Sequence, residues 1–420
     1  DCLLSRGLGD VYKRQVVNTC CFINDAKEES VNTILEMAEY KKTGSCKVLV
    51  VTGCMAQRYK NEIIEEVPEV DAVLGTTSYG DILKAIREAM EGKHFQEFKD
   101  IDYLPEKLGK RVLTTGGHFG YLKIAEGCDK HCTYCIIPKL RGKFRSVPME
   151  RLVTQAKEMA EEGVKELILV AQETTVYGTD IYGKKSLHIL LKELCKIKGI
   201  RWIRVLYCYP EEIYDELIQT MKEEKKICHY LDLPIQHASD RILKRMGRRT
   251  TQAELVEIVN KLRREIPDIV LRTTLISGFP GETQEDHEEL MSFVDEMEFD
   301  RLGVFTYSPE EDTPAATMPD QVAEEVKEAR RDEIMELQQE ISYDKGTDRI
   351  GQELLVMIEG KVADESAYIG RTYGDAPKVD GYIFVQTGEL LMTGDFAKVR
   401  VTGALAVSYT HLTLPTKRIV

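Results

Sequence analysis

The feature that most constrains the fold is a strand followed by a helix, repeated six times from Gly120 onward. Short apolar runs alternate with helical patterns of ten or more residues, such as Glu150–Glu162 and Thr251–Glu265. This alternation predicts parallel strands covered by helices. The expected strands are Tyr121–Ala125, Glu166–Ala171, Trp202–Leu206, Tyr230–Pro234, Val270–Ile276 and Leu302–Thr306.

Six such units predict an α/β fold with a partial (β/α)6 barrel that is open on one side. In barrels of this kind the chemistry lies at the carboxyl ends of the strands. A doubly wound open sheet is the alternative that the alternation leaves open.

The N-terminal part of the chain shows the same alternation and predicts a separate parallel α/β domain. Strands are expected at Val16–Cys20, Lys47–Thr52 and Val70–Leu74. An amphipathic helix is expected near Ala26–Lys42. Residues 91–118 are polar and contain Gly and Pro, which indicates a linker. We therefore expect this domain, whose first strand is missing from the pattern, over residues 16–92 and the barrel over residues 118–345.

The C-terminal part predicts a long charged helix from about Val322 to Tyr343, followed by short strands separated by Gly-Asp turns. Their spacing over residues 349–405 predicts a small β-barrel. Between Arg349 and Arg400, six Lys and Arg oppose eight Asp and Glu, a net charge of −2. Phosphate contacts dominate RNA affinity, so an RNA-binding barrel is expected to be basic. The acidic balance favours a basic protein partner, although a local basic patch stays open as an alternative.

Composition limits the class of protein and its compartment. The chain has a formal charge of −14 and eleven cysteines. No apolar run approaches the roughly 20 residues that span a membrane. Without a secretory signal, the close cysteine spacing indicates metal ligands in a reducing cytoplasm rather than disulfides. Residues 1–15 and 407–420 break the regular patterns and resemble translated adapter sequence, so we expect them to be non-native; a tag or frayed terminus is the alternative.

The chemistry of the chain centres on the run Glu126–Pro138, which contains Cys128, Cys132 and Cys135 in a C-x₃-C-x₂-C pattern. Three thiolates cannot complete a tetrahedral structural zinc site without a fourth ligand. They are able to hold three irons of a 4Fe–4S cube and leave the fourth iron open for a ligand. A zinc knuckle with a remote fourth ligand is the alternative.

Two further cysteines are expected to lie close together in the N-terminal domain. Cys20 and Cys54 each follow the carboxyl end of a predicted strand, where ligands of parallel sheets collect. Strand alternation turns the neighbouring Cys21 to the other side, so Cys20 is the favoured candidate. Two buried apolar cysteines are the alternative.

The cysteine run resembles the signature of radical S-adenosylmethionine (SAM) enzymes, in which the open iron binds SAM. The resemblance implies that Tyr134 packs near the adenine and that polar groups at Gln172, Glu173 and Thr174 lie near the methionine amine. The Ser277–Thr283 segment ends the fifth strand. Its glycines, Gly278 and Gly281 among them, allow backbone to approach a ligand closely, and Glu282-Thr283 is expected to start the next helix.

The segments VVNTCCFI, at residues 16–23, and VTGCMAQRY, at residues 51–59, resemble cluster motifs of the methylthiotransferase family. The resemblance implies a second 4Fe–4S cluster on Cys20 and Cys54. The family's first cysteine, in a Cys-Pro-Lys-Asn-like turn, has no match here, so this auxiliary site lacks a ligand in the chain as given. Val147 stands where the family commonly has arginine. The C-terminal strands resemble a TRAM domain.

Three segments resemble the RimO-type branch of this family: Ile137–Ser146, Val304–Glu311 and Gly370–Gly381. That branch implies methylthiolation of an aspartate β-carbon on small-subunit ribosomal protein twelve, alone or on the ribosome. It further implies an electron donor such as flavodoxin or ferredoxin, a cytoplasmic location and no membrane. A tRNA adenosine methylthiotransferase and a metal-stabilised RNA-binding protein are the alternatives.

Overall fold

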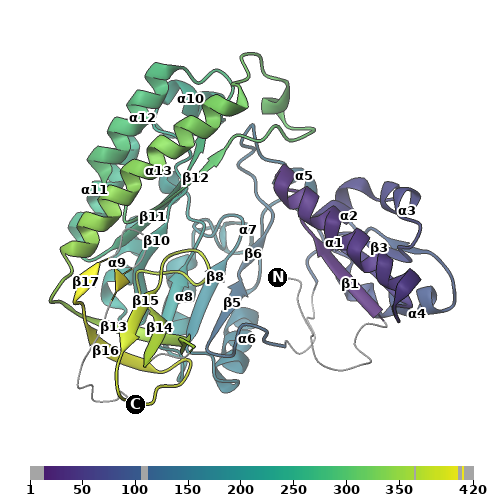
Figure 1. The fold of residues 1–420 in the computed structure, drawn as a ribbon, viewed down its shortest axis with the longest axis horizontal. Coiled ribbons are helices and arrows are strands. Elements are labelled where there is room, and N and C mark those ends of the chain that lie inside the picture. Colours follow the sequence, from purple (N-terminus) through teal and green to yellow (C-terminus); the bar gives the residue numbers. More distant parts are fainter. Residues whose placement is uncertain (1–13, 106–111, 364–365, 405–408, 411–420) are drawn as a thin grey trace. The chain divides into compact units, whose positions relative to one another are not determined.

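The computed structural model describes residues 14–105, 112–363, 366–404 and 409–410 (Figure 1). The chain divides into two compact units. The first contains residues 1–111, 126–145 and 308–317, and the second contains residues 112–125, 146–307 and 318–420. The run with the three cysteines thus belongs to the same unit as the N-terminal sheet.

The first unit is built on a parallel sheet with the strand order β1-β2-β3-β4. Its strands are β1 (Arg14–Thr19), β2 (Val48–Gly53), β3 (Ala72–Leu74) and β4 (Phe95–Glu97). Its longer helices are α1 (Asn24–Thr43), α2 (Cys54–Tyr59), α3 (Glu62–Glu66) and α4 (Ile82–Met90), and η2 (Tyr79–Asp81) is a short 3₁₀ turn. Every residue of β2 is buried, as expected for a central parallel strand. The linker expectation is wrong at β4, which pairs with β3.

The second unit contains six parallel strands in the order β12-β11-β10-β9-β8-β5. They are β5 (Phe119–Lys123), β8 (Glu166–Val170), β9 (Trp202–Val205), β10 (Ile227–Asp232), β11 (Val270–Ser277) and β12 (Arg301–Thr306). The spatial order follows the chain order without a reversal. Right-handed crossovers then bring the helices that connect consecutive strands to the same side of such a sheet. This topology confirms the partial barrel and excludes the doubly wound alternative, which needs a reversal of strand order.

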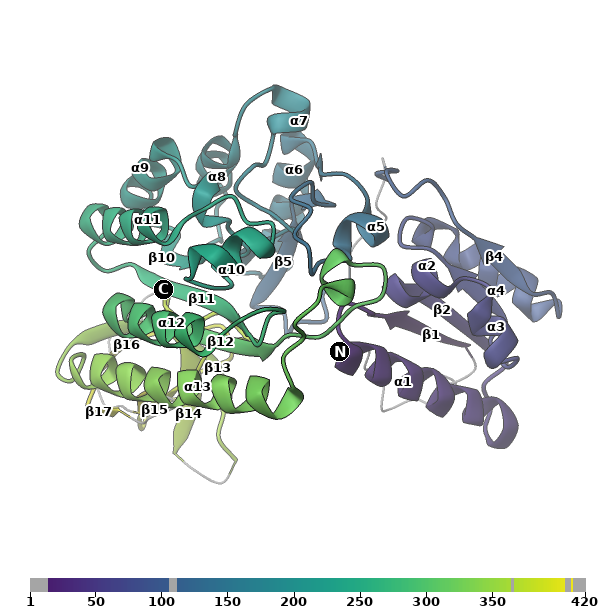
Figure 2. The ribbon, with the colours of Figure 1, turned by 90° about the horizontal axis from the view of Figure 1, so that it is seen from above.

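The helices of the second unit cover the outer face of this sheet (Figure 2). They are α6 (Met149–Glu161), α7 (Thr179–Tyr182), α8 (Leu187–Cys195), α9 (Asp215–Glu223), α10 (Asp240–Arg245), α11 (Gln252–Glu265), α12 (Gln284–Met297) and α13 (Glu324–Thr347), with the 3₁₀ turn η3 (Pro210–Glu212). The long helix α13 packs along α12 and β12 and also contacts the C-terminal sheet at β17. It therefore connects the barrel to the C-terminal strands.

The C-terminal strands form a curled, mostly antiparallel sheet in the order β16-β13-β14-β15-β18-β17 (Figure 1). They are β13 (Glu353–Lys361), β14 (Ala367–Arg371), β15 (Ile383–Gln386), β16 (Phe396–Arg400), β17 (Gly403–Ala404) and β18 (Tyr409–Thr410). This half-barrel packs against the parallel sheet: the ring of Phe396 meets Trp202 edge-on, with 4.9 Å between the ring centroids. Met357 and Ala376 join Trp202 and Phe119 in one apolar core.

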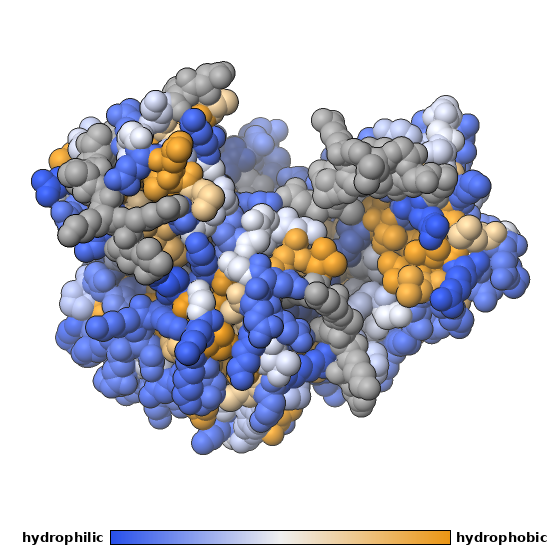
Figure 3. All heavy atoms as spheres, turned by 90° about the horizontal axis from the view of Figure 1, so that it is seen from below, coloured by the Kyte–Doolittle hydropathy of each residue, from blue (hydrophilic) through white to orange (hydrophobic). Residues whose placement is uncertain are grey.

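Two general features of the surface and the helices bear on function. Figure 3 shows a face on which hydrophilic side chains surround smaller hydrophobic patches. Within the described residues, no helix has the length and apolar character that crossing a membrane requires.

Candidate active site

The loop with the three cysteines is fixed at both ends by its own backbone. It lies between β6 (Ala125–Glu126) and β7 (Arg145–Ser146). Gly127 has a φ of +81°, and a Cβ there would lie 2.0 Å from the carbonyl oxygen of Lys143, so only glycine fits. The N–H of Cys128 donates to the carbonyl of Gly142 at 3.2 Å. These contacts close the loop and hold the three thiols in one region.

The three thiols interact with one another electrostatically. Cys128 and Cys132 are buried and Cys135 is partly exposed. Burial above all, and then the neighbouring Cys132 and Cys128, raise the pKa of Cys135 to about 12. A thiolate at this position needs nearby positive charge, which fits an iron–sulfur cluster. In the part of the chain that the structure describes, no three His, Cys, Asp or Glu side chains have the arrangement of ligands around a single ion. The fit of this loop to an iron–sulfur cluster therefore rests on the chemistry of its three thiols.

A short helix ties this loop to the core of the N-terminal domain. Helix α5 (Ile137–Arg141) follows the third cysteine directly. Ile136 and Leu140 are buried in the same apolar cluster as Leu49 of β2. The hydroxyl of Thr76 donates to the carbonyl of Leu140 at 3.0 Å. Sequence reasoning missed this contact, for which the spacing of two apolar residues one helical turn apart was the only local signal.

Cys20 and Cys54 lie at the same edge of the N-terminal sheet. The last residues of β1 and β2, Thr19 and Gly53, are register partners, and each cysteine is the next residue along the chain. Cys20 is exposed and Cys54 is buried. Burial is the main cause that raises the pKa of Cys54, and the nearby Cys20 raises it further. The two thiols are therefore close, as the sequence predicted, while Cys21 is fully buried in the domain core.

Arg141, the last residue of α5, connects these thiols to the cysteine loop. Its guanidinium forms a side-chain hydrogen bond with Cys54 and interacts electrostatically with Cys20. It also lies 3.7 Å from the carboxylate of Glu126. No role for this arginine was predicted from the sequence, because its partners come from separate segments of the chain.

Residues 308–317 support the same region of the first unit. The carboxylate of Glu310 is buried and forms ion pairs with Lys27 at 2.9 Å and with Arg58 at 3.2 Å. The N–H of Ala315 donates to the carbonyl of Thr133, inside the cysteine loop, at 2.9 Å. The 3₁₀ turn η4 (Pro314–Thr317) ends the segment.

The predicted SAM-binding residues lie at several places in the two units. Tyr134 is half-buried in the cysteine loop, and Gln172 is half-buried just beyond β8. Glu173 and Thr174 are buried. The carboxylate of Glu173 accepts the N–H of Thr175 at 2.8 Å. Both Glu173 and Thr174 therefore hold protein backbone, since the Thr174 hydroxyl donates to the carbonyl of Leu206 at 2.9 Å.

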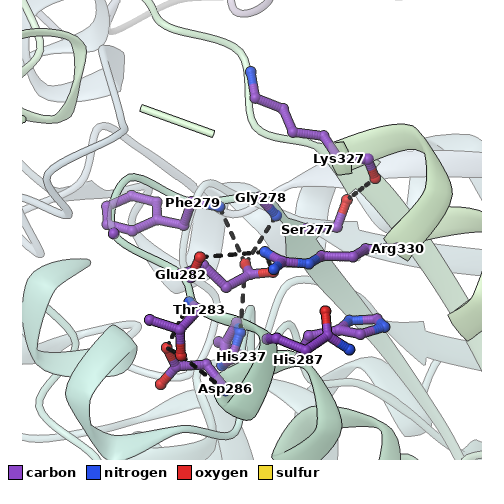
Figure 4. Close-up of polar contacts among 12 residues, drawn as sticks. His237, Ser277, Gly278, Phe279, Glu282, Thr283, Asp286, His287, Lys327 and Arg330 are labelled. Carbon is purple, nitrogen blue, oxygen red and sulfur yellow. Dashed lines mark hydrogen bonds and ion pairs between the residues drawn. The ribbon is translucent and has the colours of Figure 1, made fainter. Parts of the chain in front are cut away.

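The loop after β11 is organised around the carboxylate of Glu282 (Figure 4). It accepts the N–H groups of Gly278 at 2.8 Å and Phe279 at 3.1 Å and pairs with Arg330 at 2.9 Å. A Cβ at Gly278 would lie 2.1 Å from the side chain of Lys327, and one at Gly281 would lie 2.8 Å from the side chain of Arg245. Both glycines are thus required by packing within the protein.

The start of helix α12 is as predicted. Thr283 is the N-cap and forms a reciprocal capping box with Asp286 (Figure 4). His237, fully buried below this loop, lies 3.6 Å from Glu282, and its Nδ1 accepts the N–H of Ser239 at 2.9 Å.

Comparison with known proteins identifies the family. A model of the radical SAM superfamily matches residues 122–294, the uncharacterized protein family UPF0004 matches residues 10–75, and a TRAM domain matches residues 350–408. A protein of Lachnoclostridium phytofermentans named ribosomal protein uS12 methylthiotransferase RimO is 66% identical over 389 residues, covering 93% of this chain and 88% of the relative. The chain belongs to the RimO family.

Other RimO proteins and solved structures agree with this assignment. RimO of Clostridium perfringens is 54% identical and RimO of Clostridioides difficile 50% identical; these cover 93% and 95% of this chain and 87% and 90% of the relatives. The radical SAM methyltransferase TsrM of Kitasatospora setae, with cobalamin and a [4Fe-4S] cluster bound, shares the fold with a TM-score of 0.53 at 13% identity. That match covers 91% of this chain and 72% of TsrM. At this identity the likeness concerns the fold alone. In this chain the C-x₃-C-x₂-C loop and the pair Cys20 and Cys54 belong to one compact unit.

Proposed function

We propose that this protein is a radical SAM methylthiotransferase that adds a methylthio group to the β-carbon of an aspartate on ribosomal protein uS12. The observation that carries the proposal is the 66% identity to a uS12 methylthiotransferase across nearly the whole chain. The proposed organisation is a methylthiotransferase domain over residues 16–92, a radical SAM domain over 118–345 and a TRAM domain over 349–405.

Two groups of thiols would hold the cofactors. Cys128, Cys132 and Cys135 would bind one 4Fe–4S cluster, and Cys20 and Cys54 would supply two ligands of a second. Tyr134 and Gln172 would contact SAM. When bound, the two clusters and SAM would supply a 5′-deoxyadenosyl radical, which removes a hydrogen atom, and a methylated sulfur, which takes the place of that hydrogen.

The reaction explains why the site has thiols rather than a general base at its centre. The β C–H of an aspartate is barely acidic beside an ionised carboxylate, so proton abstraction is ineffective. Because the proposed reaction uses both sets of thiols, the protein has to hold them close to each other. Arg141 supports this role, because its guanidinium contacts Cys54 and lies near Glu126 at the start of the cysteine loop.

Partners and compartment follow from the same chemistry. Reductive cleavage of SAM needs an electron of low potential, so we propose a donor such as flavodoxin or ferredoxin. All ten cysteines in the described residues are free thiols, which supports a cytoplasmic location. A basic ribosomal protein, free or on the ribosome, suits the acidic chain.

Mass spectrometry of a deletion strain complemented with this gene tests the proposal. We expect uS12 to gain one methylthio group and tRNA to stay unchanged. A gain on tRNA alone would replace the proposed substrate with the tRNA alternative. In vitro, anaerobic reconstitution should give iron-loaded protein that forms 5′-deoxyadenosine from SAM and dithionite. Protein that binds only zinc and never forms this product would be a metal-stabilised binding protein instead.

A further inference from the structure

One face of the six-stranded sheet, which the C-terminal half-barrel covers in part, keeps some partly exposed side chains. Along β11, Arg272, Thr274 and Ile276 are partly exposed, whereas the alternating residues between them are buried. Tyr121 of β5 is likewise partly exposed beside the buried Leu122. Because alternate residues of a strand point to opposite faces, these partly exposed side chains lie on one face of the sheet.

Tyr207 stands at the carboxyl end of β9 in a strained conformation. Its φ is +60°, a left-handed value that a residue with a bulky side chain rarely adopts. Its side chain is 47% exposed, so burial of the ring does not account for the strain. Strained residues of this kind persist only where their surroundings fix them, and they concentrate at functional sites.

The backbone of Tyr207 is fixed from both neighbouring strands. On the β8 side, the N–H of Thr174 donates to the carbonyl of Tyr207 at 3.1 Å, and the Thr174 hydroxyl shares its hydrogen between this carbonyl at 3.1 Å and that of Leu206 at 2.9 Å. On the β10 side, the N–H of Tyr207 donates to the buried carboxylate of Asp232 at 3.2 Å. Two independent sets of hydrogen bonds therefore hold the backbone of Tyr207 in its left-handed conformation.

Asp232 is in turn fixed from the C-terminal half-barrel. Its other carboxylate oxygen accepts Nη1 of Arg272 at 2.8 Å, and Nε of Arg272 lies 3.4 Å from the carboxylate of Asp380. Asp380 also accepts the hydroxyl of Tyr230 at 2.7 Å. A chain of contacts thus runs from the loop after β14, through Arg272 and Asp232, to Tyr207.

The phenol of Tyr207 has the chemistry of a hydrogen-bond donor. Burial raises its pKa and the adjacent Asp232 raises it further, against the opposing effect of Arg272, so the hydroxyl keeps its proton at neutral pH. The phenol also interacts electrostatically with Tyr121 on the inner face of β5. The exposed ring of Tyr207 thus stands beyond the carboxyl end of β9, where barrels of this kind hold their chemistry.

We propose that Tyr207 contacts the protein substrate, its hydroxyl donating a hydrogen bond to the side-chain carboxylate of the target aspartate, and that Asp232, Arg272 and Asp380 are positioning residues for it. The inference rests on the proposed function, because that function supplies an aspartate as the substrate. It gives the C-terminal half-barrel a part in substrate selection that does not depend on binding RNA.

The first test measures binding of a synthetic uS12 peptide with the target aspartate, and of the same peptide with asparagine, to the reconstituted protein without reductant. We expect Tyr207→Phe to weaken binding of the aspartate peptide about tenfold, as for a hydrogen bond to a charged group. The asparagine peptide, whose amide oxygen is a neutral acceptor, should lose less binding than the aspartate peptide on the same change. In separate turnover assays with reductant, the KM for SAM should not change in Tyr207→Phe.

Tyr207→Gly separates a functional from a structural role, because glycine adopts a positive φ without strain. We expect its Tm to be equal to or above that of the unaltered protein while peptide binding is lost. Glu298→Gly is the matched control: Glu298 is an exposed residue with a φ of +41°, and the variant should keep full binding. A lower Tm for Tyr207→Gly with unchanged binding would show that Tyr207 is structural.

The positioning role is tested with two isosteric changes in the same loop. Asp380→Asn weakens the hold on Arg272, so the KM for the peptide should rise while 5′-deoxyadenosine formation from SAM alone stays intact. Asp375→Asn breaks a comparable buried pair with Arg301, 2.6 Å away, that does not lead to Tyr207. It should leave the peptide KM unchanged.

Further outcomes overturn the inference in whole or in part. Equal peptide KM values for Asp380→Asn and Asp375→Asn would remove the positioning role. A raised KM for SAM in Tyr207→Phe would assign the residue to the cofactor. If the unaltered protein modifies uS12 and Tyr207→Phe does so with the same KM, the inference fails but the proposed function stands; if the unaltered protein never modifies uS12, both fail.

Discussion

Nη2 of Arg371 lies 2.7 Å from Oε2 of Glu166, and both side chains are fully buried. This pair joins β14 of the C-terminal half-barrel to the first residue of β8. Arg204 on β9 shares the same carboxylate, at 2.8 Å, and also donates to the carbonyl of Tyr373 at 2.6 Å. Further along, Asp375 pairs with Arg301 on β12. Among the described residues, the two edge strands of the parallel sheet, β5 and β12, do not pair, and the end of β14 with the loop after it joins the sheet across its width.

Removal of the Glu166 carboxylate should be strongly destabilising. Burial alone raises the pKa of Glu166, but Arg371 and Arg204 outweigh it and lower the pKa, so the group is ionised at neutral pH. Glu166→Ala leaves two buried guanidinium groups without this partner, at a cost of about 3–5 kcal/mol. The measurement is chemical denaturation. Glu353→Ala, which removes an exposed partner of Arg400, should change the free energy of unfolding by less than about 1 kcal/mol.

Loss of a single thiol from the cysteine loop should abolish SAM cleavage. Cys132→Ala removes one of the three proposed cluster ligands, so bound iron should fall by about four atoms per chain and 5′-deoxyadenosine should not form. Iron analysis and chromatography of the products measure both effects. Cys195→Ala, in helix α8, is the control and should match the unaltered protein. Full SAM cleavage by Cys132→Ala would disprove the ligand assignment.

The thiols of the N-terminal sheet should affect a different step. Cys54→Ala is expected to keep 5′-deoxyadenosine formation while methylthio transfer to uS12 is lost, because this thiol belongs to the second proposed cluster. Mass spectrometry of uS12 and product analysis on the same samples separate the two steps. Cys46→Ala, another buried thiol of the same domain, should retain both. Equal loss of both steps in Cys54→Ala would argue for one shared site.

The sequence predicted the elements with strong local signals and missed the features set by distant contacts. The strands from Glu166 and Val270 begin where predicted, because continuous apolar runs with helical segments between them have few other solutions. Strand β4 was missed because Phe95–Glu97 is three residues long with one apolar side chain. The packing of Leu140 in the N-terminal core and the left-handed backbone of Tyr207 depend on partners far away in the chain, which local patterns do not reveal.

Acid should weaken the start of helix α12 through Asp286. Burial alone raises the pKa of this carboxylate, but hydrogen bonds from the backbone of Thr283, from Ser239 and from Arg241 outweigh it and lower the pKa to about 2. A lowered folded-state pKa contributes stability above the unfolded-state value near 3.9, and this contribution is lost as the pH falls toward about 2. Asp286→Asn should therefore lower the stability at pH 7 by about 1 kcal/mol, as for a lost helix cap. Denaturation midpoints measure the difference in stability between the unaltered protein and Asp286→Asn. This difference should shrink as the pH falls from about 4 to about 2, the range of the two pKa values. A difference that stays constant over this range would show that the carboxylate charge does not stabilise the fold. Asp295→Asn, an exposed change on the same helix, is the control and should alter the midpoint little at any pH.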